Sequence, residues 1–224
     1  LRADSQGAPY SGRRSMSRGR FIVFEGGEGA GKSTQAKNLA KKLMDSGLDV
    51  HLTREVGGSV LAEEIRKLWL ADRALACDAM TELLLIFAAR REHLTKTVWP
   101  NLEIGTWVVC DRFVDSTLVY QGDGMGLDHG SIHALYAMVA KDFVPDLTLI
   151  LDIPVAVSRQ RIAARQQDRY ERESAAFHEK LRQGFLRLAQ ETPERRKVVD
   201  ATQSLMSVQD AIWQQVQPLL ARGA

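Results

Sequence analysis

The sequence has few cysteines and no long apolar run. Its 224 residues include two cysteines, Cys77 and Cys110, which are too few for a disulfide framework, and Cys110 falls in an apolar run that we expect to be core. No apolar run approaches the roughly 18 residues that a membrane-spanning helix needs. Free thiols with no secretory signal ahead of them predict a protein of the reducing cytoplasm.

The chain also lacks a large excess of charge of one sign. The formal net charge is +2, but the first twenty residues carry five arginines against one aspartate, so removing their +4 leaves −2 for the remainder. A folded part without excess positive charge is not expected to bind a nucleic-acid polymer. The composition, 45% hydrophobic and 26% charged, is ordinary for a globular protein, and the length suits one domain with a sizeable core.

Residues 1–19 differ in composition from the rest of the chain. They are rich in Ser, Gly and Arg and show no apolar periodicity. We therefore expect a disordered segment, either a native tail or an addition ahead of Met16. Residues 20–224 show neither repeats nor a second core, and are expected to form a single domain.

Apolar, strand-like runs alternate with helical stretches after residue 20. The runs are Phe21–Glu25, Asp49–Thr53, Trp107–Asp111, Leu147–Asp152 and Lys197–Asp200. The candidate helices lie near 32–46, 60–71, 79–103, 129–142, 154–165, 172–190 and 207–221. This alternation predicts a doubly wound α/β fold, with a parallel sheet covered on both faces. Ligands of such folds gather at the carboxyl ends of the strands.

The strongest motif is a glycine-rich loop. Its sequence, Gly26-Gly27-Glu28-Gly29-Ala30-Gly31-Lys32-Ser33 with Thr34 following, matches G-x-x-x-x-G-K-[ST]. A strand runs directly into the loop and a helical pattern runs out, as a phosphate-binding loop requires. The loop N–H groups and the helix N-terminus would hold phosphate oxygens, Lys32 would reach the β/γ-phosphates of ATP, and Ser33 would ligate Mg²⁺.

Arginines stand at the ends of other strands and in the later polar run. They occur in Thr53-Arg54-Glu55, in Asp111-Arg112 and between Arg159 and Arg172. Moving a phosphoryl group between two anions requires positive charge near the transfer point. In one interpretation, Asp111 holds Mg²⁺ through water and Arg112 binds phosphate. In the other, the two residues form only a local salt bridge.

Five segments together resemble the thymidylate kinase family. They are GGEGAGKST, TREVGGSVLAEEIR, LLLIFAARREHL, DRFVDSTLVYQG and DRYERE, in family order over most of residues 20–200. The resemblance implies the P-loop nucleoside monophosphate kinase fold, with a five-stranded parallel sheet and a short helical lid at about 159–172. It also implies a cytoplasmic homodimer that phosphorylates dTMP to dTDP with ATP and Mg²⁺, for dTTP biosynthesis.

The resemblance also implies residue roles. On the acceptor side, Phe87 stacks on thymine, Gln121 bonds the base edge, Tyr120 packs beside the deoxyribose, Thr117 lies near the base, Glu28 contacts the 3′-hydroxyl, and Arg54, Arg90 and Arg112 surround the phosphate and base. The donor ATP lies on the loop from Gly26 to Thr34. The catalytic set is Lys32, Arg112, Asp111 and the lid arginines Arg165 and Arg169, with Ser33 and Asp111 at the metal.

Some of these assignments have alternatives. Phe87 shares helical spacing with neighbouring leucines and would otherwise be read as core. The family has an arginine three or four residues after the stacking ring. Arg90 fits the three-residue spacing and is preferred, and Arg91 fits the four-residue spacing. Val56 stands where the family usually has proline, so the sequence does not determine the path of the Arg54 loop. The lid lacks a glycine often found after its first arginine, so the sequence does not determine where the Arg165 side chain points.

Two other functions are also compatible with the sequence. One is a kinase of another nucleoside monophosphate or of a deoxynucleoside, which would share the loop but not the pyrimidine pocket. The other is a nucleotide-dependent switch, although the chain has neither the N-K-x-D motif of guanine-nucleotide switches nor the L-S-G-G-Q signature of transporters. In the kinase reading no general base is needed, because the acceptor phosphate is already a nucleophilic anion, so catalysis is alignment and charge neutralisation.

Overall fold

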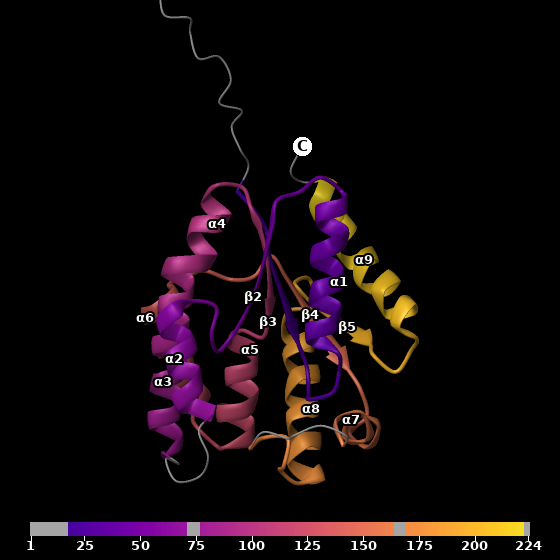
Figure 1. The fold of residues 1–224 in the computed structure, drawn as a ribbon. Helices are drawn as coiled ribbons and strands as arrows, with labels where there is room; N and C mark the ends of the chain where they lie inside the picture. The colour runs from indigo at the N-terminus through magenta and orange to yellow at the C-terminus, as the bar shows by residue number, and fades with distance from the viewer. Residues whose placement is uncertain (1–17, 71–76, 164–168, 222–224) are drawn as a thin grey trace, which may run out of the picture.

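The computed structural model describes residues 18–70, 77–163 and 169–221. Its centre is one five-stranded sheet, which confirms the predicted α/β class (Figure 1). The strands are β1 (Phe21–Glu25), β2 (Val50–Arg54), β3 (Trp107–Asp111), β4 (Leu147–Asp152) and β5 (Arg196–Asp200). All neighbouring strands are parallel, and each predicted run lies within one residue of the observed strand.

The order of the strands is β2-β3-β1-β4-β5, so β1 lies at the centre. In the register, Phe24 of β1 pairs with Asp111 of β3, and Arg54 of β2 pairs with the same residue. The carboxyl ends of three strands therefore meet at one edge. The phosphate loop after β1, the Arg54 loop and the Asp111-Arg112 pair are brought together there.

One face of the sheet is covered by α1 (Lys32–Asp45) and α9 (Leu205–Ala221). Ile22 and Phe24 of β1 point to this face and pack against apolar residues of both helices. Phe21 and Val23, which alternate with them, point to the opposite face. Because β1 buries both faces, its apolar run is continuous, as in parallel sheets generally.

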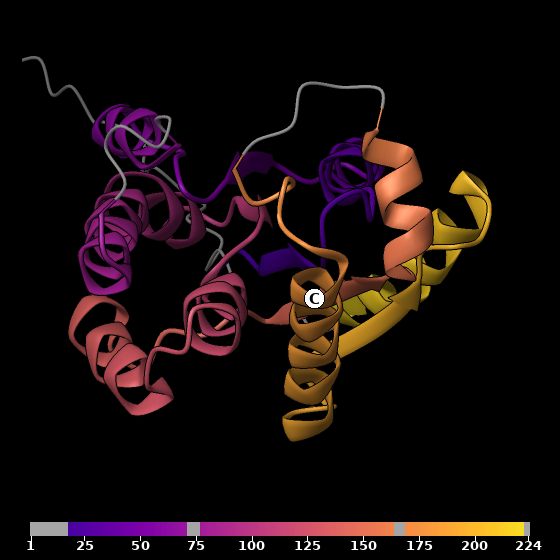
Figure 2. The ribbon, with the colours of Figure 1, turned by 90° about the horizontal axis from the view of Figure 1, so that it is seen from below.

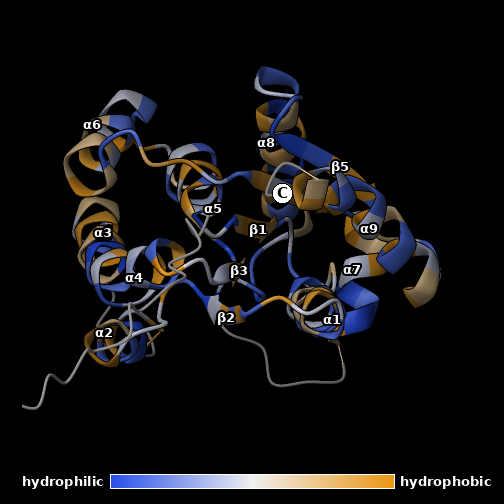
Figure 3. Ribbon diagram, turned by 90° about the horizontal axis from the view of Figure 1, so that it is seen from above, coloured by the Kyte–Doolittle hydropathy of each residue, from blue (hydrophilic) through white to orange (hydrophobic). Residues whose placement is uncertain are grey.

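The opposite face is covered by helices that follow β2 and β3 and by one helix that follows β4. They are α2 (Val60–Leu70), α3 (Ala79–His93), the π-helical segment η2 (Leu94–Val98), α4 (Trp99–Glu103), α6 (His129–Ala140) and α8 (Ala175–Glu191). Seen from above, α3, α4 and α6 lie across the strands from α1 and α9 (Figure 3), and the view from below shows the same division (Figure 2). No helix among the described residues is both long and apolar enough to cross a membrane.

Two details differ from the sequence prediction. The single helix expected over 79–103 consists of α3, η2 and α4, and Pro100 lies in the first turn of α4. Proline has no N–H to offer to the preceding turn, so a regular α-helix cannot run through this point unchanged. The sequence predicted no helix after β3, but α5 (Val114–Thr117) continues there into the π-helical segment η3 (Leu118–Gly124).

The lid and the N-terminal segment are only partly covered. Helix α7 (Val155–Ile162) is described, and so is the turn from Arg169 onward, whereas residues 164–168 between them lie outside the described residues. Residues 1–17 lie outside them as well. The lid at about 159–172 and the disordered tail therefore remain predictions.

Candidate active site

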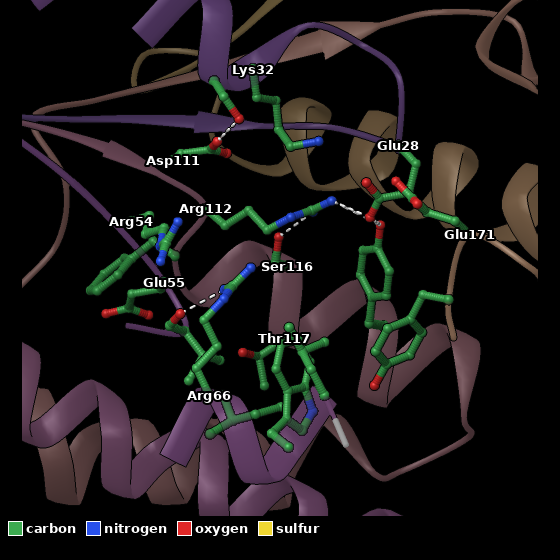
Figure 4. Close-up of a pocket in the computed structure, with 18 of the residues that line it drawn as sticks. Glu28, Lys32, Arg54, Glu55, Arg66, Asp111, Arg112, Ser116, Thr117 and Glu171 are labelled. Atoms are coloured by element: carbon green, nitrogen blue, oxygen red, sulfur yellow. Dashed lines mark hydrogen bonds and ion pairs between the residues drawn. The ribbon is translucent and has the colours of Figure 1, made fainter. Parts of the chain in front are cut away.

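A cavity of about 490 Å³ opens at the carboxyl ends of the strands. Its lining comes from the loop after β1, the ends of β2 and β3, α2, α3, α5, η3, the end of α7 and the turn at Tyr170. Basic and acidic side chains from these separate elements lie around it (Figure 4). Because α/β folds bind ligands at this edge of the sheet, the cavity is the candidate active site.

The glycine-rich loop forms one wall and requires glycine for two reasons. Gly26 has a φ angle of +128°, and a Cβ atom there would lie 2.4 Å from the carbonyl oxygen of Leu151. Gly29 has a φ angle of +66°, and a Cβ atom there would lie 2.8 Å from the carbonyl oxygen of Ser158. A loop of this shape can turn its N–H groups toward an anion, and α1 begins directly after it at Lys32.

Lys32 supplies a positive charge to this wall. Its Nζ donates a hydrogen bond to the carbonyl oxygen of Gly27 at 2.7 Å, and the residue is 7% exposed. Burial lowers the pKa of Lys32, and the nearby charge of Arg112 lowers it further. An anion bound in the loop would offset both effects, so Lys32 is well placed to bind phosphate.

Ser33 and Asp111, the two residues that the sequence analysis assigned to a metal, meet at the start of α1. The Ser33 hydroxyl donates to Oδ2 of Asp111. Oδ1 of Asp111 is buried, with no hydrogen-bond partner among the described residues. Two hard oxygen donors, one carrying an unsatisfied lone pair, suit Mg²⁺, which takes few protein ligands and completes its shell with phosphate and water.

Arg112 occupies the middle of the cavity. Its φ angle of +71° is in the left-handed region, which is unusual for a residue other than glycine and is typical of functional sites. The guanidinium donates to Glu28 Oε1 at 2.5 Å, to the Tyr120 hydroxyl at 3.2 Å and to Ser116 Oγ at 3.0 Å. Burial alone would lower the pKa of Arg112, but the Glu28 carboxylate and other anionic groups raise that pKa above its usual value. The guanidinium of Arg112 therefore stays positively charged.

Glu25, at the end of β1, holds the segment after Arg112 from behind. Its carboxylate accepts hydrogen bonds from the backbone N–H groups of Phe113 (2.8 Å) and Ser116 (3.1 Å) and from the Ser116 hydroxyl (2.6 Å). Burial, together with the neighbouring charge of Asp115, raises the pKa of Glu25 to about 7. Glu25 thus fixes the hydroxyl that Arg112 contacts.

Arg90 lies in the wall opposite the phosphate loop. Its Nε donates to Glu55 at 2.8 Å and its Nη2 to the Thr117 hydroxyl at 2.9 Å, while the buried Nη1 has no partner among the described residues. Although burial alone would raise it, the pKa of Glu55 is lowered by the charge of Arg90 and by His93. Arg91 donates to the carbonyl oxygen of Val139, and of the two arginines Arg90 is the one that lines the cavity.

Other cavity residues were missed by the sequence analysis. Arg66 of α2 lines the cavity beside Arg54, and burial, followed by the charge of Arg54, lowers its pKa. Trp69, Ile86 and Arg161 also contribute to the lining. Arg66 is the last residue of the family segment TREVGGSVLAEEIR, which was a signal for it, whereas nothing in the sequence separated Trp69 from an ordinary helix position.

The lid arginines are placed only in part. Arg165 lies outside the described residues. Arg169 does not line the cavity: its Nη2 donates to Glu82 at 2.5 Å and to the Tyr170 hydroxyl at 3.0 Å. Gln121 does line the cavity, and its Nε2 donates to Glu82 at 2.7 Å.

Comparison with known proteins identifies the family. A family model described as thymidylate kinase matches residues 24–212. The chain belongs to the thymidylate kinase family. A thymidylate kinase of Marinomonas sp. is 49% identical over 203 residues, covering 90% of this chain and 96% of that protein, and one of Pseudomonas putida is 51% identical over 194 residues, covering 85% and 91%.

The fold is that of a solved thymidylate kinase. The crystal structure of the enzyme from Ehrlichia chaffeensis matches with a TM-score of 0.74 and 33% sequence identity, and the match covers 88% of this chain and 98% of that one. As a member of the thymidylate kinase family, the chain is a phosphotransferase that uses ATP to phosphorylate dTMP to dTDP.

Phe87 does not lie where the sequence analysis put it. The residue is 2% exposed, belongs to a core cluster with Leu83, and does not line the cavity. The preceding residue, Ile86, lines the cavity instead. Both residues are buried, but successive residues on an α-helix point about 100° apart, so Ile86 faces the cavity and Phe87 does not. The structure therefore does not support stacking of Phe87 on thymine.

Replacing Phe87 and Ile86 in turn tests this correction. We expect Phe87→Ala to lower the free energy of unfolding by about 3–5 kcal/mol, because it empties a core position, without changing the KM for dTMP of the folded enzyme. Ile86→Ala should raise that KM. Denaturant unfolding and steady-state kinetics measure the two effects, and a Phe87→Ala enzyme of wild-type stability with a raised KM for dTMP would restore the stacking role.

Proposed function

We propose that this cavity holds the phosphates of ATP on the loop Gly26–Thr34 and dTMP across the facing wall, and that the phosphoryl group passes between them beside Arg112. The observation that carries the proposal is the convergence of Lys32, Arg54, Arg66 and Arg112, from four separate elements, on one cavity that also contains the Ser33–Asp111 pair. Four cations around one opening suit two anionic substrates.

Mg²⁺ would be held by Ser33 directly and by Asp111, either directly or through water. When bound, the ion would neutralise phosphate charge and orient the transferred group. Lys32 would bind the β- and γ-phosphates. These residues need no proton transfer, because the acceptor phosphate is already an anion.

The residues around Arg112 would position the acceptor. Arg112, with Arg54 and Arg66, would bind the phosphate of dTMP and draw it toward the donor. Glu28, which Arg112 and the Tyr120 hydroxyl both contact, would accept a hydrogen bond from the 3′-hydroxyl of the sugar. Tyr120 would pack beside C2′ of the deoxyribose, where a 2′-hydroxyl finds little room.

The base would lie against Arg90, Thr117 and Gln121. Arg90 Nη1 is a buried donor without a partner among the described residues, so a carbonyl oxygen of the base would satisfy it. Thr117 holds the same guanidinium in place through its hydroxyl. A pyrimidine with an oxo edge is the ligand that this wall suits best.

The lid would supply further positive charge. We assign Arg165 and Arg169 to the transferring phosphoryl group in the closed state of a lid at about 159–172. Arg161, at the end of α7, already lines the cavity and supports an approach from this side. Closure would have to exchange the Glu82 partner of Arg169 for phosphate.

A second copy of the chain would bind beside the acceptor pocket. Helices α3 and α6 pack together and leave apolar side chains on their outer surface, Leu84 (51% exposed) and Met138 (72% exposed) among them. This exposed surface supports a homodimer, and a monomer mass near 25.0 kDa in light scattering would contradict it.

The cytoplasm is the proposed location of the protein, and enrichment of the protein in another cell fraction would contradict that proposal.

An acceptor panel tests the proposed function. ATP turnover should be fastest with dTMP and much slower with dCMP, dGMP and dAMP, because the wall at Arg90 and Gln121 suits a pyrimidine with an oxo edge. Turnover should require Mg²⁺ and stop when the ion is chelated. Formation of ADP and of the nucleoside diphosphate is followed for each acceptor. Equal turnover of dGMP, or full activity without a divalent cation, would contradict the proposal.

A further inference from the structure

Glu82 is a buried carboxylate beside the part of the cavity assigned to the base. It lies on α3, is 1% exposed and does not line the cavity. Its Oε1 accepts hydrogen bonds from Nε2 of Gln121 at 2.7 Å and from the Tyr170 hydroxyl, and its Oε2 pairs with Arg169 at 2.5 Å. Three elements that are far apart in sequence thus meet at one carboxylate.

This carboxylate determines how the amide of Gln121 is oriented. An ionised carboxylate can only accept hydrogen bonds, so the amide nitrogen of Gln121 must face Glu82. The reversed amide would place Oε1 against the carboxylate oxygen and leave the amide nitrogen unpaired, which is costly in a buried place. Nε2 is held a second time by the Tyr170 hydroxyl at 3.2 Å.

Oε1 is then the atom that Gln121 offers to a ligand. Gln121 lines the cavity, and within the described part of the chain Oε1 accepts no hydrogen bond from any residue. In the same lining, Nη1 of Arg90 is a donor without a partner among those residues. The wall therefore has an acceptor at Gln121 and, within Arg90, a buried donor that is unpaired among the described residues.

Thymine and cytosine differ in these two groups. Thymine carries a hydrogen on N3 and an oxygen on C4, so it offers a donor and an acceptor. Cytosine has a lone pair on N3 and an amino group on C4, the reverse arrangement. A wall with its acceptor at Gln121 and its donor at Arg90 pairs with the first and repels the second.

We propose that Glu82 is a specificity-determining positioning residue, which holds the Gln121 amide so that its oxygen accepts the N3–H of the acceptor base. The proposal rests on the proposed role of Gln121 at the base edge. Glu82 itself touches no substrate and acts through Gln121. Its effect should therefore appear in the choice between bases.

Glu82→Gln tests the proposal with almost no change in shape. The new amide can donate or accept, so it no longer dictates the orientation of Gln121. We expect the ratio of kcat/KM for dTMP to that for dCMP to fall about tenfold or more, since a site with its polar groups unmatched loses discrimination. A general effect on stability or on the lid would change both acceptors alike and leave the ratio constant.

Two further variants separate the possible failures. Glu64→Gln, an exposed change on α2, should leave the ratio at the wild-type value. Gln121→Ala should lower the ratio; if it does not, the proposed role of Gln121 is wrong. If Gln121→Ala lowers the ratio and Glu82→Gln leaves it within twofold of the wild type, the inference about Glu82 alone is overturned.

Tyr170→Phe gives a second measurement if Glu82→Gln does not fold. It removes the hydroxyl that donates to Oε1 of Glu82 and accepts from Nε2 of Gln121, so the carboxylate and the amide both lose a partner, and it leaves the ring in place. The ratio should fall by about threefold, the scale of one neutral hydrogen bond. An unchanged ratio in this variant would likewise contradict the proposal.

Discussion

Lys32→Ala is expected to lower kcat by at least about a hundredfold, the usual cost of losing one preorganised charge at a transferring group. Lys32 is the first residue of α1, and its ammonium group is held over the phosphate loop by the carbonyl oxygen of Gly27. No other lysine lines the described cavity, so no neighbouring ammonium group can replace it. Single-turnover formation of dTDP measures the effect directly.

The fold should survive this substitution. Lys32 belongs to none of the apolar core clusters, and burial together with Arg112 already opposes its charge, so alanine removes an unfavourable group from the folded state. Thermal unfolding should therefore occur at or slightly above the wild-type temperature. Lys41→Ala, on the exposed side of the same helix, is the matched control and should keep full activity. A Lys32→Ala enzyme with more than about a tenth of wild-type kcat would refute the assigned role.

Arg112→Ala is expected to reduce kcat/KM for dTMP by about a hundredfold or more and to raise KM as well. Arg112 organises the acceptor side, because Glu28, Ser116 and Tyr120 each accept a hydrogen bond from its guanidinium. Arg112→Lys keeps the charge but loses the planar fork, so it should recover only part of the activity. Arg91→Ala, outside the cavity, is the control and should leave both constants unchanged.

The lid arginines should give a different kinetic pattern in the same experiment. Arg165→Ala or Arg169→Ala is expected to lower kcat by about a hundredfold with little change in the KM for dTMP, as for a contact made mainly in the transition state. The loop contributes no arginine of its own, since its variable positions are Gly27, Glu28, Gly29 and Ala30. If both lid variants keep wild-type kcat, the lid does not supply this charge, and Arg54 or Arg112 must carry it.

Local patterns in the sequence predicted much of the fold and part of the site. All five strands were found within one residue. The three inner strands, β1, β3 and β4, are buried on both faces and are therefore continuous apolar runs, whereas the edge strands β2 and β5 are only partly buried. The phosphate loop and Asp111-Arg112 could be placed because each directly follows such a strand. The helical segment over 114–124 was missed, since it is short and was interpreted only as a motif.

Within the site, the sequence determined residue types and chain order: a glycine loop, a lysine at the start of a helix, and an aspartate and an arginine at the end of a strand. Tertiary structure alone decided between Ile86 and Phe87, because adjacent residues of one helix differ only in the direction they face. It also brought Arg66 into the cavity and joined Glu82 to Gln121, which are 39 positions apart. Such contacts depend on how α2, α3 and η3 are packed in the folded protein, and no local pattern in these segments specifies that packing.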